Sequence, residues 1–148
     1  MGLNYISVEQ ALDIYKKSIQ YSGGTISGVL NQGVLESVLA LVKNDCYYPT
    51  FIDKLAYLVY SFCKNHCFVD GNKRISILLG TQFLLINGHE DVAESFLRIM
   101  ENNICAVAAS LIDRELLKRL FTAIVDKTFD KDEELLYKLF HITKSLYK

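Results

Sequence analysis

Residues 65–74 read NHCFVDGNKR, and residues 75–86, ISILLGTQFLLI, follow them directly. The first stretch is the most polar segment of the chain, and it combines a histidine, a carboxylate, a glycine, an amide and cationic side chains. The second is apolar almost all the way round, which predicts a buried central helix. A loop entering such a helix meets unpaired backbone N–H groups and the positive end of the helix dipole. The sequence therefore predicts a phosphate-type anion site at this point.

The polar side chains of this loop suit phosphate chemistry. His66 is a candidate general base, because an unperturbed imidazole is largely neutral at cytoplasmic pH and accepts a proton from an attacking hydroxyl. Asp70 is a candidate ligand of Mg²⁺, which typically takes one or two carboxylates together with substrate phosphates. Asn72, Lys73 and Arg74 supply hydrogen-bond donors, and a guanidinium grips two phosphate oxygens at once. These residues predict phosphoryl or nucleotidyl transfer.

Two further loop residues have structural tasks, and each polar residue also has a plainer explanation. Phe68 is expected to anchor the loop in the core, and Gly71 lets the backbone approach a ligand closely. On the plainer reading, Asp70 is an N-cap, His66 is a part-buried residue that closes the preceding helix, and the two cations are solvated. The combination of all of them favours a functional site.

The segment 68–74 behind His66 resembles the signature of the Fic/Doc family, His-Pro-Phe-x-Asp/Glu-Gly-Asn-Gly-Arg. Lys73 stands where Fic proteins have their last Gly, as in the Doc (death-on-curing) branch of toxins. Residues 28–39, GVLNQGVLESVL, look like the Doc-type segment G-x-R-D-x-G-x-L-E-S-A-L. The resemblance extends over roughly residues 6–88. Two differences stand out, Cys67 in place of Pro and Leu-Asn at 30–31 in place of Arg-Asp.

The resemblance implies an all-α bundle around a buried helix and an enzyme that uses ATP and Mg²⁺. In that family His66 would deprotonate a hydroxyl of a target protein and Asp70 would hold the metal. The loop backbone at Gly71, with Asn72 and Arg74, would bind the nucleotide phosphates.

Lys73 decides between two transfers within this resemblance. A lysine side chain fills the anion pocket that glycine leaves open, and in Doc the nucleotide binds reversed, so that its γ-phosphate is delivered. The resemblance therefore implies a kinase toxin that phosphorylates a Ser/Thr hydroxyl of a target such as elongation factor Tu, restrained by a separate antitoxin. AMP transfer of the Fic type and an inactive helical binding module are the alternatives.

Length and composition indicate one domain over residues 1–148. The resemblance implies a Fic/Doc-like core at about 6–126, followed by an extra C-terminal helix. The chain is 51% hydrophobic and 22% charged, and its net charge of −1 gives no reason to expect nucleic-acid binding. It has neither a secretory signal nor an apolar run long enough for a membrane helix, so a cytoplasmic protein is expected. The four cysteines are expected to be reduced and buried, in preference to a zinc site built on Cys63, His66 and Cys67. The oligomeric state is left open.

Hydrophobic periodicity and capping signals predict the helices. They are expected at about residues 7–21, 33–43, 50–64, 72–87, 91–109 with a break at 102–103, 113–127, and 132–147 as an extra C-terminal helix. Residues 44–49 are predicted either to form a short β-hairpin flap that holds a target peptide or to cover the core with Tyr47 and Tyr48. The C-terminal helix is expected to pack on the core.

Overall fold

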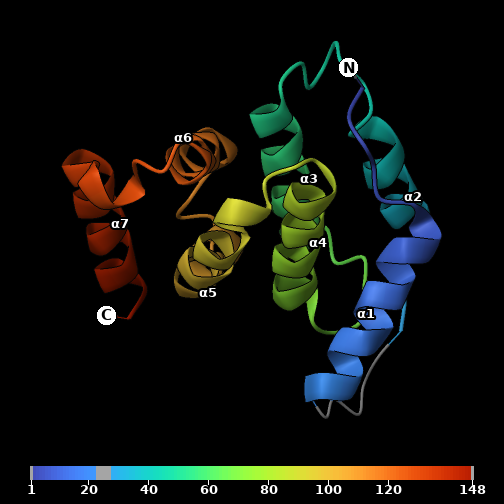
Figure 1. The fold of residues 1–148 in the computed structure, drawn as a ribbon. Helices are drawn as coiled ribbons and strands as arrows, with labels where there is room; N and C mark the ends of the chain where they lie inside the picture. The colour runs from blue at the N-terminus through green and yellow to red at the C-terminus, as the bar shows by residue number, and fades with distance from the viewer. Residues whose placement is uncertain (1, 23–27, 148) are drawn as a thin grey trace.

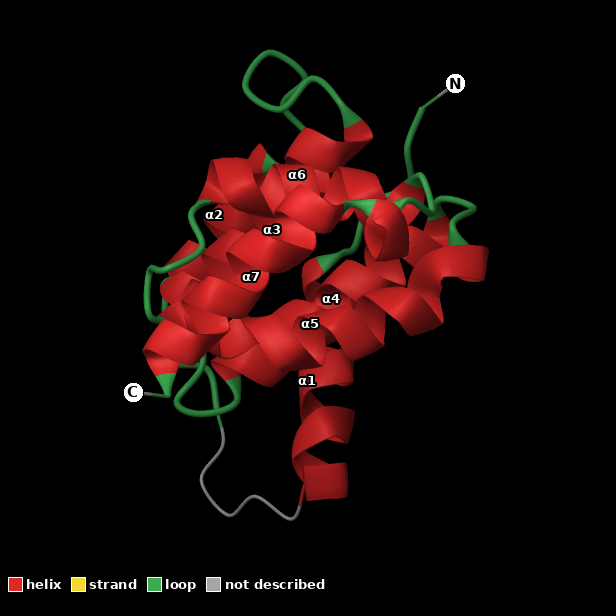
Figure 2. Cartoon of the chain, turned by 90° about the vertical axis from the view of Figure 1, so that its left-hand side faces the viewer, coloured by secondary structure: helices red, strands yellow, loops and turns green. Residues whose placement is uncertain are grey.

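The computed structural model describes residues 2–22 and 28–147. All regular structure in these residues is helical, and no strand appears among them in the cartoon of Figure 2. The α-helices are α1 (Val8–Ser22), α2 (Gln32–Leu41), α3 (Phe51–Lys64), α4 (Asn72–Ile86), α5 (Ala93–Ala108), α6 (Arg114–Val125) and α7 (Glu133–Leu146). Single 3-10 turns precede α5 (Glu90–Val92) and α7 (Phe129–Lys131). The predicted all-α fold is confirmed.

Helices α3 and α4 pack against each other at the centre of the molecule (Figure 1). Helices α1 and α2 lie on one side of this pair, α5 and α6 lie on the other, and α7 is outermost against α5. The central position of α4 requires a small residue at Gly80, where an added Cβ would lie 2.8 Å from Val59 of α3 and 2.8 Å from Phe96 of α5. The buried central helix is confirmed, and α3 is buried alongside it.

Polar side chains fix the start of several helices. Thr50 and Asp53 form a reciprocal capping box at α3, in which Asp53 N donates to Thr50 Oγ1 and Thr50 N donates to an Asp53 carboxylate oxygen. Asn31, Asp113 and Asp132 cap α2, α6 and α7 in the simpler way, each accepting from a backbone N–H in the first turn. These helices therefore begin directly after residues that are typical N-caps in the sequence.

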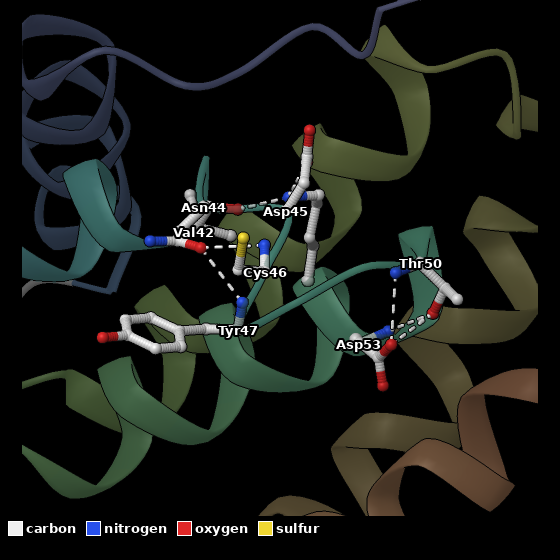
Figure 3. Close-up of polar contacts among 8 residues, drawn as sticks. Val42, Asn44, Asp45, Cys46, Tyr47, Thr50 and Asp53 are labelled. Carbon is white, nitrogen blue, oxygen red and sulfur yellow. Dashed lines mark hydrogen bonds and ion pairs between the residues drawn. The ribbon is translucent and has the colours of Figure 1, made fainter.

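The flap predicted at residues 44–49 is wrong, because these residues form a tight turn (Figure 3). Asn44 Oδ1 accepts hydrogen bonds from the backbone N–H groups of Cys46 and Tyr47, at 2.9 and 3.0 Å. Tyr48 stacks on Tyr57 of α3 with ring centroids 4.1 Å apart, whereas Tyr47 is 68% exposed. This turn precedes α3, while the polar loop follows it, so the two are separated by roughly 20 Å of helix.

The same corner contains a buried cation. Lys54 is 1% exposed, and its Nζ donates to the carbonyl oxygen of Val42 at 2.9 Å and lies 2.8 Å from an Asp45 carboxylate oxygen. These contacts join the end of α2, the turn and the start of α3.

Two expectations for the C-terminal half had different outcomes. The break at residues 102–103 is wrong: α5 is continuous, and buried Asn103 donates from its side chain to the carbonyl oxygen of Ile99 within the helix. Helix α7 packs on the core through Leu135 and Leu139, as expected. Among the described residues, no helix combines the length and apolarity needed to cross a bilayer.

Candidate active site

A cavity of about 810 Å³ lies between the N-terminus of α4 and one flank of α5, a volume typical of small-molecule and cofactor sites. Every polar residue that the sequence singled out lies on its wall. The lining residues are Cys63 and His66 at the end of α3, Val69 to Arg74 of the loop and first turn, Ile77 and Leu78 of α4, and Leu97, Glu101, Ile104 and Ala108 of α5.

The loop has an unusual backbone at two residues. His66 has φ 49° and Gly71 has φ 81°, both in the left-handed region that glycine adopts most easily. Gly71 is the N-cap of α4, and no side chain caps the helix there. The alternative in which Asp70 serves as the N-cap is thereby wrong. The first N–H groups of α4 have no side-chain cap at the cavity, which is the arrangement that binds anions.

Phe68 anchors the loop, as predicted. Its side chain is completely buried, and its ring stacks on that of Tyr15 with centroids 3.8 Å apart and planes inclined by 15°. This contact joins the loop to α1, so the N-terminal helix helps to position the site.

Tyr15 is a site-supporting residue that the sequence reading missed. Its hydroxyl donates to the backbone carbonyl of Asp70 at 3.0 Å and accepts from the backbone N–H of Gly28 at 3.2 Å. In the sequence Tyr15 is only one member of the apolar face of α1, and nothing there indicates a partner in the loop.

Asn72 holds the loop closed through its side-chain amide. Its Oδ1 accepts from the backbone N–H of Phe68 at 3.1 Å, and its Nδ2 donates to the carbonyl of Phe68 at 2.9 Å. The Asn72 amide thus pairs with both backbone polar groups of Phe68, as a residue on an adjacent β-strand would. The side chain was predicted to donate to phosphate, and what it contacts here is the loop itself.

A short extended segment runs antiparallel to the loop. The backbone N–H groups of Leu30 and Asn31 donate to the carbonyl oxygen of Cys67. The backbone N–H of Val69 donates to the carbonyl oxygen of Gly28, and all three distances lie between 2.8 and 3.1 Å. The strand-like partner of the loop is therefore residues 28–31, not the turn at 44–49.

The charged side chains of the site have no internal partners. His66, Asp70, Lys73 and Arg74 are exposed, and within the described residues none of their side chains makes an ion pair or a hydrogen bond. Unpaired cations beside an uncapped helix N-terminus are suited to bind phosphate oxygens. The arrangement can therefore hold a polyphosphate next to an imidazole that accepts a proton.

The donor set around Asp70 fits Mg²⁺ only in part. No group of three or more His, Cys, Asp and Glu side chains in the described part of the chain is arranged to hold a metal ion. Mg²⁺ usually completes its shell with water and substrate phosphates around one or two carboxylates. Asp70 therefore fits an ion that arrives together with a nucleotide.

The end of α3 closes the cavity beside the loop. Lys64 Nζ donates to the carbonyl of Ala108 at 3.1 Å and to the hydroxyl of Ser110, which ties α3 to the C-terminus of α5.

Burial raises the pKa of Cys63 to about 11, so this cavity thiol stays protonated at neutral pH. Cys63 and Cys67 are buried free thiols, as expected, whereas Cys46 and Cys105 are exposed, which corrects that expectation.

A comparison with protein families matches the part of the chain that contains the loop. A family model described as the Fic/DOC family matches residues 5–84. The protein named Toxin Doc from Mycolicibacterium smegmatis is 37% identical over 76 residues, which cover 49% of this chain and 58% of that toxin. The chain thus matches less than two thirds of the length of this relative. No solved structure matches the chain.

Proposed function

The chain belongs to the Fic/DOC family, and from this premise we propose that it is a Doc-like toxin that transfers the γ-phosphate of ATP to a Ser/Thr hydroxyl of a target protein. The observation that carries the proposal is one cavity shared by His66, Asp70, Arg74 and the uncapped N-terminus of α4. The similarity to a protein named Toxin Doc supports the toxin class.

In this proposal His66 is the general base. Its imidazole takes the proton of the target hydroxyl as the hydroxyl oxygen forms a bond to the γ-phosphorus, and the bond from phosphorus to the β-γ bridging oxygen breaks to release ADP. His66 lines the cavity and is exposed, so a protein substrate can reach it. Such a base typically contributes roughly 10²–10⁴-fold to the rate.

The remaining loop groups bind and orient the phosphates. Arg74 offers a planar fork to two phosphate oxygens, and the first N–H groups of α4 stabilise developing negative charge. When Mg²⁺ is bound, it neutralises phosphate charge, and Asp70 is the residue that would hold it.

Lys73 supports γ-phosphate transfer over AMP transfer. Lys73 lines the cavity from the first turn of α4. By the family resemblance, it stands where a glycine would leave space for a phosphate group. Its charge remains available to a phosphate bound elsewhere, because Lys73 has no ion-pair partner in the described chain.

We also propose a protein target and a separate antitoxin as partners. Elongation factor Tu is the first target to test. Exposed apolar side chains near the loop, Val29 at 38% and Leu30 at 64% exposure, offer a surface on which an antitoxin segment can fold.

Label transfer tests the proposal. Purified elongation factor Tu and a cell lysate are incubated with the protein and with ATP labelled at either the γ- or the α-phosphate. His66→Ala is the test variant, and His141→Ala, on the exposed surface of α7, is the matched control. We expect transfer from the γ position alone, lost in His66→Ala and retained in His141→Ala. Transfer from the α position alone would make the protein an AMP transferase, and no transfer from either would favour a binding module.

A further inference from the structure

Helix α7 carries two regular stripes of side chains, one against the core and one exposed. The buried stripe consists of Leu135, Leu139, Ile142 and Leu146. The exposed stripe, the outer seam, consists of Glu133, Tyr137, Phe140 and Lys144. Both stripes have spacings of four, three and four residues, which is the spacing at which helices meet in coiled coils. Helix α7 therefore has the pattern of a helix that packs on two sides.

The centre of the outer seam is aromatic. Tyr137 is 68% exposed and Phe140 is 61% exposed, and they lie one helical turn apart. Helix α7 is the outermost helix and lies at the edge of the molecule (Figure 1). Single exposed aromatic residues are common on protein surfaces, whereas aromatic residues grouped on one helix face are typical of an interaction surface. The centre of the seam is thus suited to contact another apolar surface.

The ends of the outer seam carry opposite charges that are unused within the chain. Glu133 lies four residues before Tyr137, and Lys144 lies four residues after Phe140. Neither charge makes an ion pair within the described residues, although both carboxylates next to Glu133 pair with Arg119 of α6. The two charges are separated by about 16 Å along the helix.

The outer seam is complementary to a second copy of itself. Its order of acidic, aromatic, aromatic and basic residues is symmetric about the point between residues 138 and 139. Two antiparallel α7 helices related by a two-fold axis through this point would place Glu133 of each copy opposite Lys144 of the other copy. Tyr137 would lie opposite Phe140 in the same way. A two-fold interface requires this kind of self-complementary patch, whereas a parallel pair would place like charges together.

We infer that the outer seam of α7 is the contact surface of a homodimer in which two α7 helices pair antiparallel about a two-fold axis. One helix face per copy lies at the small end of specific interfaces, so a weak dimer is expected, with a Kd on the order of tens of micromolar. Helix α7 contributes no residue to the cavity of the candidate active site, so each copy keeps its own site. The inference does not depend on the proposed function.

Sedimentation equilibrium of the 148-residue chain over a range of concentrations tests the inference. Charge reversal is examined with Glu133→Lys, with Lys144→Glu and with the double variant that carries both changes. The aromatic centre is examined with Tyr137→Ala. Its matched control is Tyr47→Ala, which removes the same type of side chain at the same 68% exposure but outside α7.

We expect each single reversal to weaken dimerisation about tenfold, because two ion pairs become two contacts between like charges. The double variant should restore dimerisation, since opposite charges face each other again. An effect through the stability of α7 has the opposite order: both reversals oppose the helix dipole, so the double variant would then be the weakest. Tyr137→Ala should weaken dimerisation by more than about tenfold, and Tyr47→Ala should leave it unchanged.

The inference is overturned if the wild-type protein stays monomeric up to roughly 1 mM, which is far above the expected Kd. It is also overturned if Tyr137→Ala dimerises as well as Tyr47→Ala, or if the double variant dimerises no better than the single reversals. A wild-type monomer that co-sediments with phosphatidylserine vesicles, and a Tyr137→Ala variant that does not, would assign the outer seam to a lipid surface instead.

Discussion

Replacing Gly80 by alanine tests how tightly the central helices are packed. The new Cβ would lie 2.8 Å from Val59 on one side and 2.8 Å from Phe96 on the other, while ordinary contacts begin near 3.4 Å. Both neighbours are completely buried, so neither side chain can move aside without disturbing other core contacts. Overpacking of this kind costs about 1–3 kcal/mol, and the better helix propensity of alanine returns up to about 1 kcal/mol. We therefore expect a net destabilisation of about 1–2 kcal/mol.

Urea unfolding followed by circular dichroism measures this loss. With slopes of about 1–3 kcal/mol/M, a loss of about 1–2 kcal/mol should lower the midpoint by roughly 0.3–2 M with little change in slope. The matched control is Gly33→Ala in α2, where an added Cβ lies at an ordinary 3.6 Å from Asn31 and should be neutral or stabilising by up to about 1 kcal/mol. A Gly80→Ala protein as stable as the wild type would refute the packing of α4 between α3 and α5.

Three further changes test the supports of the site and of α3. Tyr15→Phe keeps the ring stack but removes the two hydrogen bonds that the hydroxyl makes, one to the loop and one to Gly28. It should lower the free energy of unfolding in urea by about 1–2 kcal/mol and weaken the binding of inorganic tripolyphosphate. Tyr21→Phe, at an exposed position, should do neither. Asn72→Asp removes the donor that closes the loop and should destabilise by about 1–3 kcal/mol, measured in the same way; an unchanged midpoint would contradict the amide clamp. Burial alone would raise the pKa of Asp53, but hydrogen bonds from Lys118 and the α3 cap hold it below its ordinary value. Its stabilising effect is therefore complete above about pH 4 and lost as the pH falls through the lowered pKa, so the stability gap between wild type and Asp53→Asn should close in acid, and a gap independent of pH would contradict this ion pair.

Local sequence was enough to predict the helices and the loop. Residues 65–74 are contiguous, so His66, Asp70 and Arg74 were expected to lie close together, and the apolar composition of residues 75–86 indicated the helix α4. The burial of Phe68 as the anchor of the loop was also predicted from the loop sequence. These features depend on interactions within one segment of chain.

Contacts between distant segments were not predictable in the same way. Tyr15 contacts a loop residue 55 positions away, and Glu101 reaches the cavity only because α5 folds back along α4. The flap was assigned by analogy of position to residues 44–49, where the side chain of Asn44 instead builds a local turn. The break predicted at residues 102–103 did not occur, because Asn103 satisfies its own amide within α5.

The supports of the loop have a thermodynamic consequence for its ligands. The Tyr15 hydroxyl, the Asn72 amide and the segment 28–31 fix the loop backbone through contacts within the protein. Ordering a residue costs about 1–2 kcal/mol of conformational entropy, and here folding has already met that cost. Under the proposed function, a phosphate ligand would therefore meet a preorganised loop and keep more of its interaction energy as affinity. By the same linkage, a substitution that loosens the contact between α1 and the loop would lower the affinity for a phosphate ligand. It would do so without altering any group that contacts the phosphates.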